Sequence, residues 1–296
     1  MLISIVICTY NRDKFILQAI KSIENQQLAN VAFELIVINN NSTDNTDAIC
    51  KSYATTAAIP FRYVIEKKQG LSFARNRGIA EAKGTIISFI DDDAIAQPTF
   101  LQNLHNFFSK HPNAVGVGGK VTPIYEKQEP AWMCRHLVGL VSKVDEGDIV
   151  KKYTHNKPYP IGCNMSYTKT ALQAVGGFNE KLAWRGDDKY IFRAIKKYSN
   201  NIFYVPDVAV GHHIDAFRLT DKNVLKLCER IGSEEGLRVK AEGMRATIFT
   251  FIDFIYKAIG SFALAAYYYV KGKPAAAKLV IQYRWLALRG LLLSVF

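Results

Sequence analysis

The first 122 residues alternate short β-rich runs with stretches of helical length, and this alternation limits the possible folds more than any other feature. The β-rich runs are ISIVIC, FELIVI, FRYVIE, TIISFI and AVGVGG, at residues 3–8, 33–38, 61–66, 85–90 and 114–119. The amphipathic stretches between them lie at residues 14–27, 43–53, 72–82 and 99–110. Near-continuous apolar strands separated by helices predict an α/β fold with a mostly parallel, Rossmann-like sheet and helices on both faces.

A polar segment follows each of the first four predicted strands. These segments read TYNR, NNNSTD, KKQG and DDD, at residues 9–12, 39–44, 67–70 and 91–93. Because ligands bind beyond the carboxyl ends of parallel strands, the four segments should converge on one site. Three adjacent carboxylates repel one another, which predicts that a cation lies among them. Asp91 and Asp93 point to one side in a strand-end D-x-D and suit Mg²⁺ or Mn²⁺; the alternative is that these acids cap the next helix.

Two further acids open a predicted helix in WRGDDKY. Asp187 and Asp188 could supply a general base beside a metal–phosphate site, because mutual repulsion and partial burial raise a carboxyl pKa. Capping of the helix is the alternative. His212, in VGHHIDAFR, is a candidate metal ligand. Arg12 and Arg75 are candidate phosphate contacts.

Charge and composition narrow the class of protein. The chain of 296 residues has a net charge of +12. Residues 216–296 hold 13 basic and 6 acidic residues and so contribute +7 of this net charge.

The five cysteines are scattered without a C-x-x-C. This pattern predicts neither a disulfide framework nor a zinc knuckle and favours the cytosol. The N-terminus lacks the pattern of a signal peptide. P-loop, G-x-G-x-x-G, G-x-S-x-G and H-E-x-x-H motifs are absent, and the basic excess lacks the interleaved aromatics of a nucleic-acid groove.

The C-terminal quarter has a different character. Residues 246–270 and 275–296 are two apolar stretches with regularly placed cations and aromatic residues, and Asp253 can pair with Lys257 inside the first. We therefore predict two domains, 1–215 and 216–296, the second a helical, membrane-associated hairpin that lies in the plane of the membrane. The alternative is a helical subdomain packed on the core or on a second copy of the chain.

Five segments, taken in order, resemble the successive motifs of the family-2 inverting glycosyltransferases with a GT-A fold. The resemblance covers about residues 1–220 and rests on ISIVICTYNR, ELIVINNNSTDNT, QGLSFARNRGIAEAKGTIISFIDDDA, IGCNMSYTKTALQAVGGFNE and RGDDKYIFRAIKK. It implies a donor-nucleotide site that comprises Thr9, Tyr10, Arg12, Asn39, Gly70, Arg75, Asn76, Asp91 and Asp92. It also implies a divalent cation, Mn²⁺ or Mg²⁺, held by Asp93, Asp91 and His212. For the acceptor it implies Asp188 as the catalytic base with Asp187 beside it, and a binding wall that comprises Gly162, Asn164 and Trp184.

Two positions depart from the family pattern. Asn39 stands where the family usually has an aspartate that accepts from the uracil N3 hydrogen, and an amide both accepts and donates. Asp187 stands where glutamate is usual. The role of Asp92 stays open at this point, and a UDP-sugar is the favoured donor.

The resemblance implies one direct displacement with inversion, in which Asp188 deprotonates a hydroxyl of a glycan or lipid-linked acceptor. We expect this chemistry on the cytoplasmic face of a membrane, in the synthesis of a cell-surface polysaccharide or glycoconjugate, with oligomerisation through the C-terminal helices and no nucleic-acid partner. Two alternatives are a nucleotidyltransferase that forms nucleotide sugars and a non-catalytic, membrane-bound scaffold that binds them.

Overall fold

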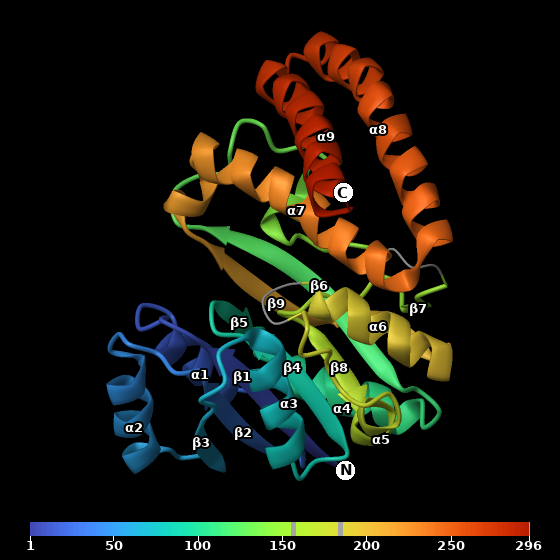
Figure 1. Cartoon of the computed structure of the whole chain (residues 1–296). Coiled ribbons are helices and arrows are strands. Elements are labelled where there is room, and N and C mark those ends of the chain that lie inside the picture. The colour runs from blue at the N-terminus through green and yellow to red at the C-terminus, as the bar shows by residue number, and fades with distance from the viewer. Residues whose placement is uncertain (155–157, 183–185, 296) are drawn as a thin grey trace. The chain divides into compact units, whose positions relative to one another are not determined.

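The computed structural model describes residues 1–154, 158–182 and 186–295, which form two compact units (Figure 1). The first unit comprises Met1–Thr122 and Val144–His213, and the second comprises Pro123–Lys143 and Ile214–Phe296. The sequence-based division at residue 215 stays a prediction. Trp184, predicted to contact the acceptor, lies outside the described residues.

Four parallel strands form one half of the sheet in the first unit. They are β1 (Leu2–Thr9), β2 (Ala32–Asn39), β3 (Phe61–Ile65) and β4 (Ile86–Asp91), in the spatial order β3-β2-β1-β4. Thr9 lies opposite Asn39, and Cys8 opposite Asp91. The polar segments after β1, β2 and β4 therefore meet at one edge of the sheet, as the alternating pattern predicts.

The other half of the sheet is antiparallel. Beyond β4 come β8 (Met165–Thr168), β6 (Gly116–Tyr125), β9 (Ile202–Ile214) and β5 (Ala94–Ala96), and β7 (Lys151–Lys152) pairs with β9. The α/β prediction is confirmed, but the sheet is mixed rather than mostly parallel. The run at 114–119 does not lie next to β4, because β8, from later in the chain, occupies that place.

Alternate residues of each central strand face two separate apolar layers. Ile5 of β1 packs with α1 (Ile16–Glu24), α2 (Thr46–Thr56) and α4 (Phe100–Lys110), whose apolar residues share its cluster. Val6 packs on the other face, and the helices of that layer are α3 (Leu71–Glu81), α5 (Lys169–Ala174) and α6 (Asp187–Tyr198). Burial of each such side chain contributes about 1.5–3 kcal/mol. These two layers hold the strand ends rigidly enough to carry a site.

The second unit is mainly helical. It contains two short 3₁₀ turns, η1 (Val138–Val141) and η2 (Ala216–Leu219), and three long helices, α7 (Asp221–Glu242), α8 (Met244–Val270) and α9 (Pro274–Val295). Glycine disfavours helices, but Gly232 does not interrupt the first long helix. α7 runs through Gly232 because the missing side chain lets α9 approach: a Cβ there would lie 1.8 Å from the carbonyl oxygen of Ala287.

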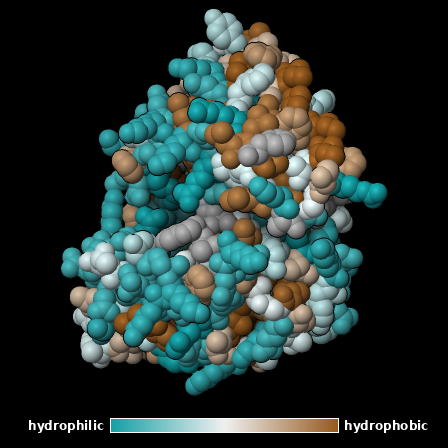
Figure 2. Space-filling model, viewed as in Figure 1, coloured by the Kyte–Doolittle hydropathy of each residue, from teal (hydrophilic) through white to brown (hydrophobic). Residues whose placement is uncertain are grey.

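One face of α8 is apolar and exposed. Figure 2 shows hydrophobic residues gathered along this helix. The exposed large apolar residues of α8 include Ile248, Phe249, Ile252, Tyr256, Ile259, Phe262 and Tyr267. Within the described residues, α8 is the one helix long and apolar enough to cross a membrane by length and composition. Asp253 and Lys257 form an ion pair on it, as the i, i+4 spacing predicts.

Candidate active site

The segments after β1 and β2 are held together by backbone-to-side-chain hydrogen bonds. The Asn11 N–H donates to Ser42 Oγ at 3.0 Å, and the Thr43 N–H donates to Asn11 Oδ1 at 2.8 Å. The Arg12 N–H donates to Thr46 Oγ1 at 3.0 Å. These bonds fix the TYNR segment and leave the Tyr10 side chain 40% exposed, where it can meet a ligand.

Asn40 fastens the segment before α3 to the end of β2. Its Oδ1 accepts from the Gly70 N–H at 2.7 Å, and its Nδ2 donates to the Lys68 carbonyl oxygen at 2.7 Å. Gly70 has φ 140°, a conformation that favours glycine. Sequence analysis names Gly70 but misses Asn40, because nothing in the run NNN distinguishes the buried anchor from its neighbours.

Asp91, Asp93 and His212 come together at the carboxyl end of β4. One potential ligand atom from each lies within 4.8 Å of the others. The pairing of β5 with β9 sets Ala94 opposite His212, and His212 Nε2 lies 3.0 Å from Asp93 Oδ1. His212 Nδ1 is buried and has no hydrogen-bond partner among the described residues. Two carboxylates and an imidazole fit a divalent cation such as Mn²⁺.

Asp92 lies beside the cluster and pairs with Arg12. The Arg12 guanidinium is 3.6 Å from Asp92 Oδ1 and 3.6 Å from Asp93 Oδ2. Burial and the charge of Asp93 raise the pKa of Asp92 to about 8, against the opposing effect of Arg12. Thr9, buried at the end of β1, also lies beside the Asp92 carboxyl group. The structure thus gives Asp92 a partner that the sequence does not indicate.

Arg75 joins the two groups of acids. Its side chain is 3% exposed, its Nη2 lies 3.1 Å from Asp91 Oδ1, and its Nη1 pairs with Asp187 Oδ2. Gly162 packs against this guanidinium, since a Cβ at 162 would lie 2.6 Å from Arg75 Nη2. The candidate metal ligands and the acids of α6 therefore belong to one site.

Asp188 lies in the first turn of α6, after Gly186 with φ 76°. Its two oxygens accept from the Lys189 N–H at 2.7 Å and from the Gly162 N–H at 3.2 Å. Burial and the neighbouring charge of Asp187 raise the pKa of Asp188 to about 6. A carboxyl with this pKa is largely ionised at neutral pH and is a better base than an exposed aspartate.

Two predicted site residues use their amides within the protein. Asn76 donates to the Phe178 carbonyl oxygen at 2.9 Å and accepts from the Phe178 N–H at 2.8 Å. Asn164 donates to the Val208 carbonyl oxygen at 2.7 Å, and its buried Oδ1 has no partner among the described residues. Asn76 therefore holds the segment after α5, whereas Asn164 keeps an acceptor atom for another group.

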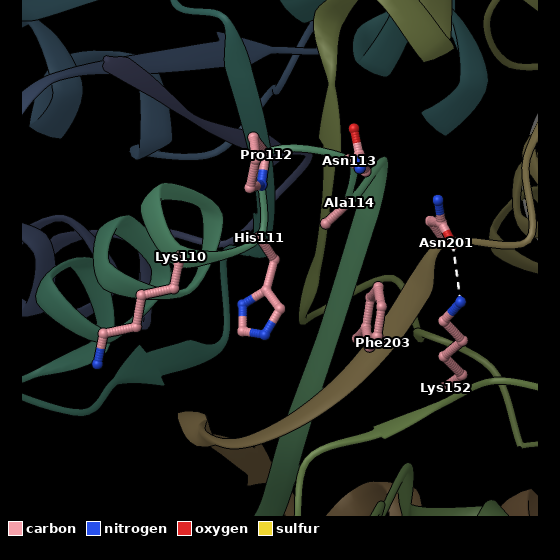
Figure 3. Close-up of a pocket in the computed structure, with 8 residues that line it drawn as sticks. All are labelled: Lys110, His111, Pro112, Asn113, Ala114, Lys152, Asn201 and Phe203. Carbon is pink, nitrogen blue, oxygen red and sulfur yellow. Dashed lines mark hydrogen bonds between the residues drawn. The ribbon is translucent and has the colours of Figure 1, made fainter.

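A separate pocket of about 320 Å³ lies where α4 ends and β9 begins (Figure 3). Its lining includes Lys110, Phe203 and Lys152, whose Nζ donates to Asn201 Oδ1 at 2.8 Å. Phe203 and His212 lie near opposite ends of β9. Nine residues of extended strand span about 30 Å, so this pocket is not part of the acidic site.

Comparisons with known proteins agree with this geometry. The family model described as "Glycosyl transferase family 2" matches residues 4–176. The "Glucosyl-dolichyl phosphate glucuronosyltransferase" of Haloferax volcanii is 22% identical over 228 residues, which are 74% of this chain and 71% of the relative. Other curated relatives are longer, and the chain spans as little as 13% of their length.

Two solved structures share the fold. TarS 1–349 of Staphylococcus aureus superposes with a TM-score of 0.57 and 19% identity, over 79% of this chain and 65% of that one. The mannosyltransferase PcManGT of Pyrobaculum calidifontis superposes with a TM-score of 0.66 and 17% identity, over 98% of this chain and 86% of that one. The predicted GT-A fold is confirmed by these matches. Because the family model covers more than half of the sequence, the chain belongs to glycosyl transferase family 2.

Proposed function

We propose that the protein is an inverting glycosyltransferase that moves a sugar from a nucleotide-sugar donor to a hydroxyl of a glycan or lipid-linked acceptor. The observation that carries this proposal is the position of Arg75 between Asp91 and Asp187. Arg75 thereby joins two groups of side chains into one site. One group is a cluster that suits a metal and a diphosphate, and the other is a pair of acids that suits an acceptor. Two relatives are named for a lipid-linked sugar, glucosyl-dolichyl phosphate, and for a polymer, poly(ribitol-phosphate), which supports a role in polysaccharide or glycoconjugate synthesis.

The donor site comprises the segments after β1, β2 and β3, with Thr9, Tyr10, Arg12, Asn39 and Gly70. Exposed Tyr10 offers a ring on which a base can stack. Structures of TarS hold UDP and UDP-GlcNAc, and that of PcManGT holds GDP-Man, which supports a nucleotide-sugar donor. A UDP-sugar is our preferred donor.

Asp91, Asp93 and His212 would hold a divalent cation, Mn²⁺ or Mg²⁺. When bound, such an ion supplies positive charge against the negative charge that develops on the diphosphate leaving group. Arg12 adds a second positive charge at the same edge, because it lies against Asp92 and Asp93. The Mn²⁺ in the PcManGT complex supports this assignment.

Asp188 is the proposed base. The N–H groups of Gly162 and Lys189 orient its carboxylate, which takes the proton of the acceptor hydroxyl. The hydroxyl oxygen forms a bond to the anomeric carbon as the bond to the diphosphate oxygen breaks, so one displacement inverts the configuration. No protein nucleophile is required. Asn164 Oδ1 and Gly162 are placed to contact the acceptor.

The second unit would place the enzyme on the cytoplasmic face of a membrane. Its exposed apolar α8 and its basic residues, which include Arg245, Lys271 and Lys273, suit an anionic membrane surface. We propose residues 1–215 as the catalytic domain and 216–296 as the region that binds the membrane or a second copy.

A transfer assay tests the proposal. Purified protein is incubated with Mn²⁺ and a panel of nucleotide sugars, and release of nucleoside diphosphate is measured with and without candidate lipid-linked acceptors. We expect turnover with one donor, strongly reduced in Asp188→Asn. Release of pyrophosphate from a nucleoside triphosphate would instead indicate a nucleotidyltransferase, and binding without turnover on any acceptor would indicate a scaffold.

A further inference from the structure

The side-chain amide of Asn39 has a fixed orientation. Asn39 ends β2, is 2% exposed, and its Oδ1 accepts from the Ser42 N–H at 2.9 Å. A backbone N–H can only donate, so the atom that faces Ser42 must be the oxygen. The amino group therefore lies on the other side, where Nδ2 donates to the Tyr63 hydroxyl at 2.6 Å.

The Tyr63 hydroxyl connects Asn39 to Asp47 by hydrogen bonds. The Tyr63 hydroxyl, on β3, donates to Asp47 Oδ1 at 2.7 Å. Asp47 Oδ2 lies 2.8 Å from Lys51 Nζ, and Lys51 together with Tyr63 lowers the pKa of Asp47. Burial and Asp47 raise the pKa of Tyr63, so the phenol keeps its proton. Its oxygen is left to accept from Asn39.

The three side chains form a chain of hydrogen bonds with only one possible direction. Asn39 donates to Tyr63, and Tyr63 donates to Asp47. With an aspartate at position 39, two carboxylates would compete for one phenol proton and would repel each other. The neutral amide at position 39 and the acid at position 47 therefore depend on each other, because both bind the same Tyr63 hydroxyl.

The hydrogen-bond chain of Asn39, Tyr63 and Asp47 lies where we expect the base of the donor nucleotide to bind. Asn39 is directly opposite Thr9 across β1 and β2, at the edge that carries the acidic site. Ser42 uses one lone pair of Oδ1, and among the described residues no second donor reaches this oxygen, so its other lone pair can accept from a ligand. Uracil, thymine and guanine carry a ring N–H that can donate to this oxygen, whereas the ring nitrogen of cytosine at the same place accepts.

We propose that Tyr63 and Asp47 are positioning residues that lock Asn39 as a hydrogen-bond acceptor toward the donor base, so that the site selects uracil-type over cytosine-type nucleotides. This inference rests on the proposed function, because it requires a nucleotide donor. It assigns a role to two residues outside the recognised motifs. It also predicts that residues 39 and 47 can exchange identities.

The test measures dissociation constants of UDP and CDP, with Mn²⁺, by calorimetry on the full chain. We expect wild type to prefer UDP by about tenfold or more, since one unmade hydrogen bond to a buried group costs about that factor. Tyr63→Phe removes one of the two hydrogen bonds that orient the Asn39 amide and leaves only the bond from the Ser42 N–H, so the preference should fall toward one. Tyr153→Phe is the matched control, because its buried hydroxyl has no partner among the described residues; there the preference should be unchanged.

Exchanging the residues at positions 39 and 47 distinguishes a positioning role of Tyr63 and Asp47 from a role in packing alone. Asn39→Asp should weaken UDP binding and lower the melting temperature. Adding Asp47→Asn should restore both, because Tyr63 can then donate to residue 39 and accept from residue 47. If Tyr63→Phe keeps the wild-type preference, or the double variant is no better than Asn39→Asp, the inference is overturned while the proposed function stands. If wild type binds neither these nucleotides nor any nucleotide sugar, the proposed function fails and the inference fails with it.

Discussion

Arg75 and Gly162 fit together so closely that no side chain has room at position 162. A Cβ there would lie 2.6 Å from Arg75 Nη2, and Arg75 cannot withdraw because Asp91 and Asp187 hold it from both sides. The same glycine donates its N–H to Asp188. One missing side chain thus preserves the link between the candidate metal ligands and the candidate base.

Gly162→Ala should reduce transfer at least about tenfold, because small displacements of catalytic groups are costly. The reduction should appear mainly in kcat. Gly139→Ala is the control, since a Cβ there meets nothing within 4 Å. Equal activity of the two variants would show that Arg75 can move without consequence.

Asp188→Asn should lower kcat by roughly 100-fold to 10,000-fold, the usual contribution of a general base. It should also raise the melting temperature at pH 7.5, by about 2–4 °C. The folded-state pKa of Asp188 is raised from 3.8 to about 6, so ionisation destabilises the fold, and this cost develops as the pH rises from 3.8 through 6.

The stability gain should therefore disappear below about pH 4, where the carboxyl is protonated in both the folded and the unfolded state. Exposed Asp207→Asn serves as the control and should change neither kcat nor the melting temperature. An Asp188→Asn protein with normal turnover would remove this residue from the mechanism.

The pH profile of wild-type kcat/KM, which reports groups of the free enzyme, should fall on the acid side with a midpoint near 6. Asp188 must be ionised to accept a proton, so below its pKa of about 6 each pH unit should cost about tenfold. Rates are measured at donor and acceptor concentrations well below their KM values, with UDP binding at pH 5 as the check that the donor site is intact. A flat profile down to pH 4.5 would contradict the assignment.

Gly232→Ala should destabilise the helical unit by roughly 1–3 kcal/mol, because the added methyl group forces α7 away from α9. Chemical denaturation followed by circular dichroism measures this effect. Gly260→Ala, on α8, is the opposite case: its Cβ meets nothing within 4 Å, and it should be neutral or stabilising by up to about 1 kcal/mol. If both variants have equal stability, the close approach of α7 and α9 is wrong.

The double variant Phe249→Glu/Ile252→Glu should abolish flotation with anionic vesicles and leave transfer to a soluble acceptor unchanged. Both side chains are exposed on the apolar face of α8. Ile149→Glu, in the first unit, changes an equally exposed apolar residue and should leave flotation unchanged. Retained flotation of the double variant would reject the membrane role of α8, and a change from dimer to monomer would assign this face to a second copy.

The sequence predicts the local elements well. The limits of β1 to β4 and of α1 to α4 fall close to the predicted ranges, because periods of two and of about 3.6 residues mark buried strands and one-sided helices. The same pattern finds the strand ends and their acids. It does not find β5, whose three residues are too few for a period, nor the full length of β6.

Glycines show where local rules fail. Gly232 reads as a helix break because glycine disfavours helices, yet α7 continues there, and its packing against Ala287 outweighs the propensity. Asn40 likewise looks like an ordinary polar residue until its backbone partners are known, and the sequence does not show that the Asn76 amide binds the backbone of Phe178.

By itself, the sequence determined which residues form strands and helices and which polar segments end the parallel strands. It therefore placed Asp91 and Asp93 at the carboxyl end of a parallel strand, the edge where we propose the ligand site. Only the tertiary structure decided their neighbours: Arg75 meets Asp187 across 112 residues of chain, and β8 is inserted between β4 and β6. Contacts of such separation depend on how the whole chain packs, whereas strand and helix patterns depend on residues within a few positions of one another.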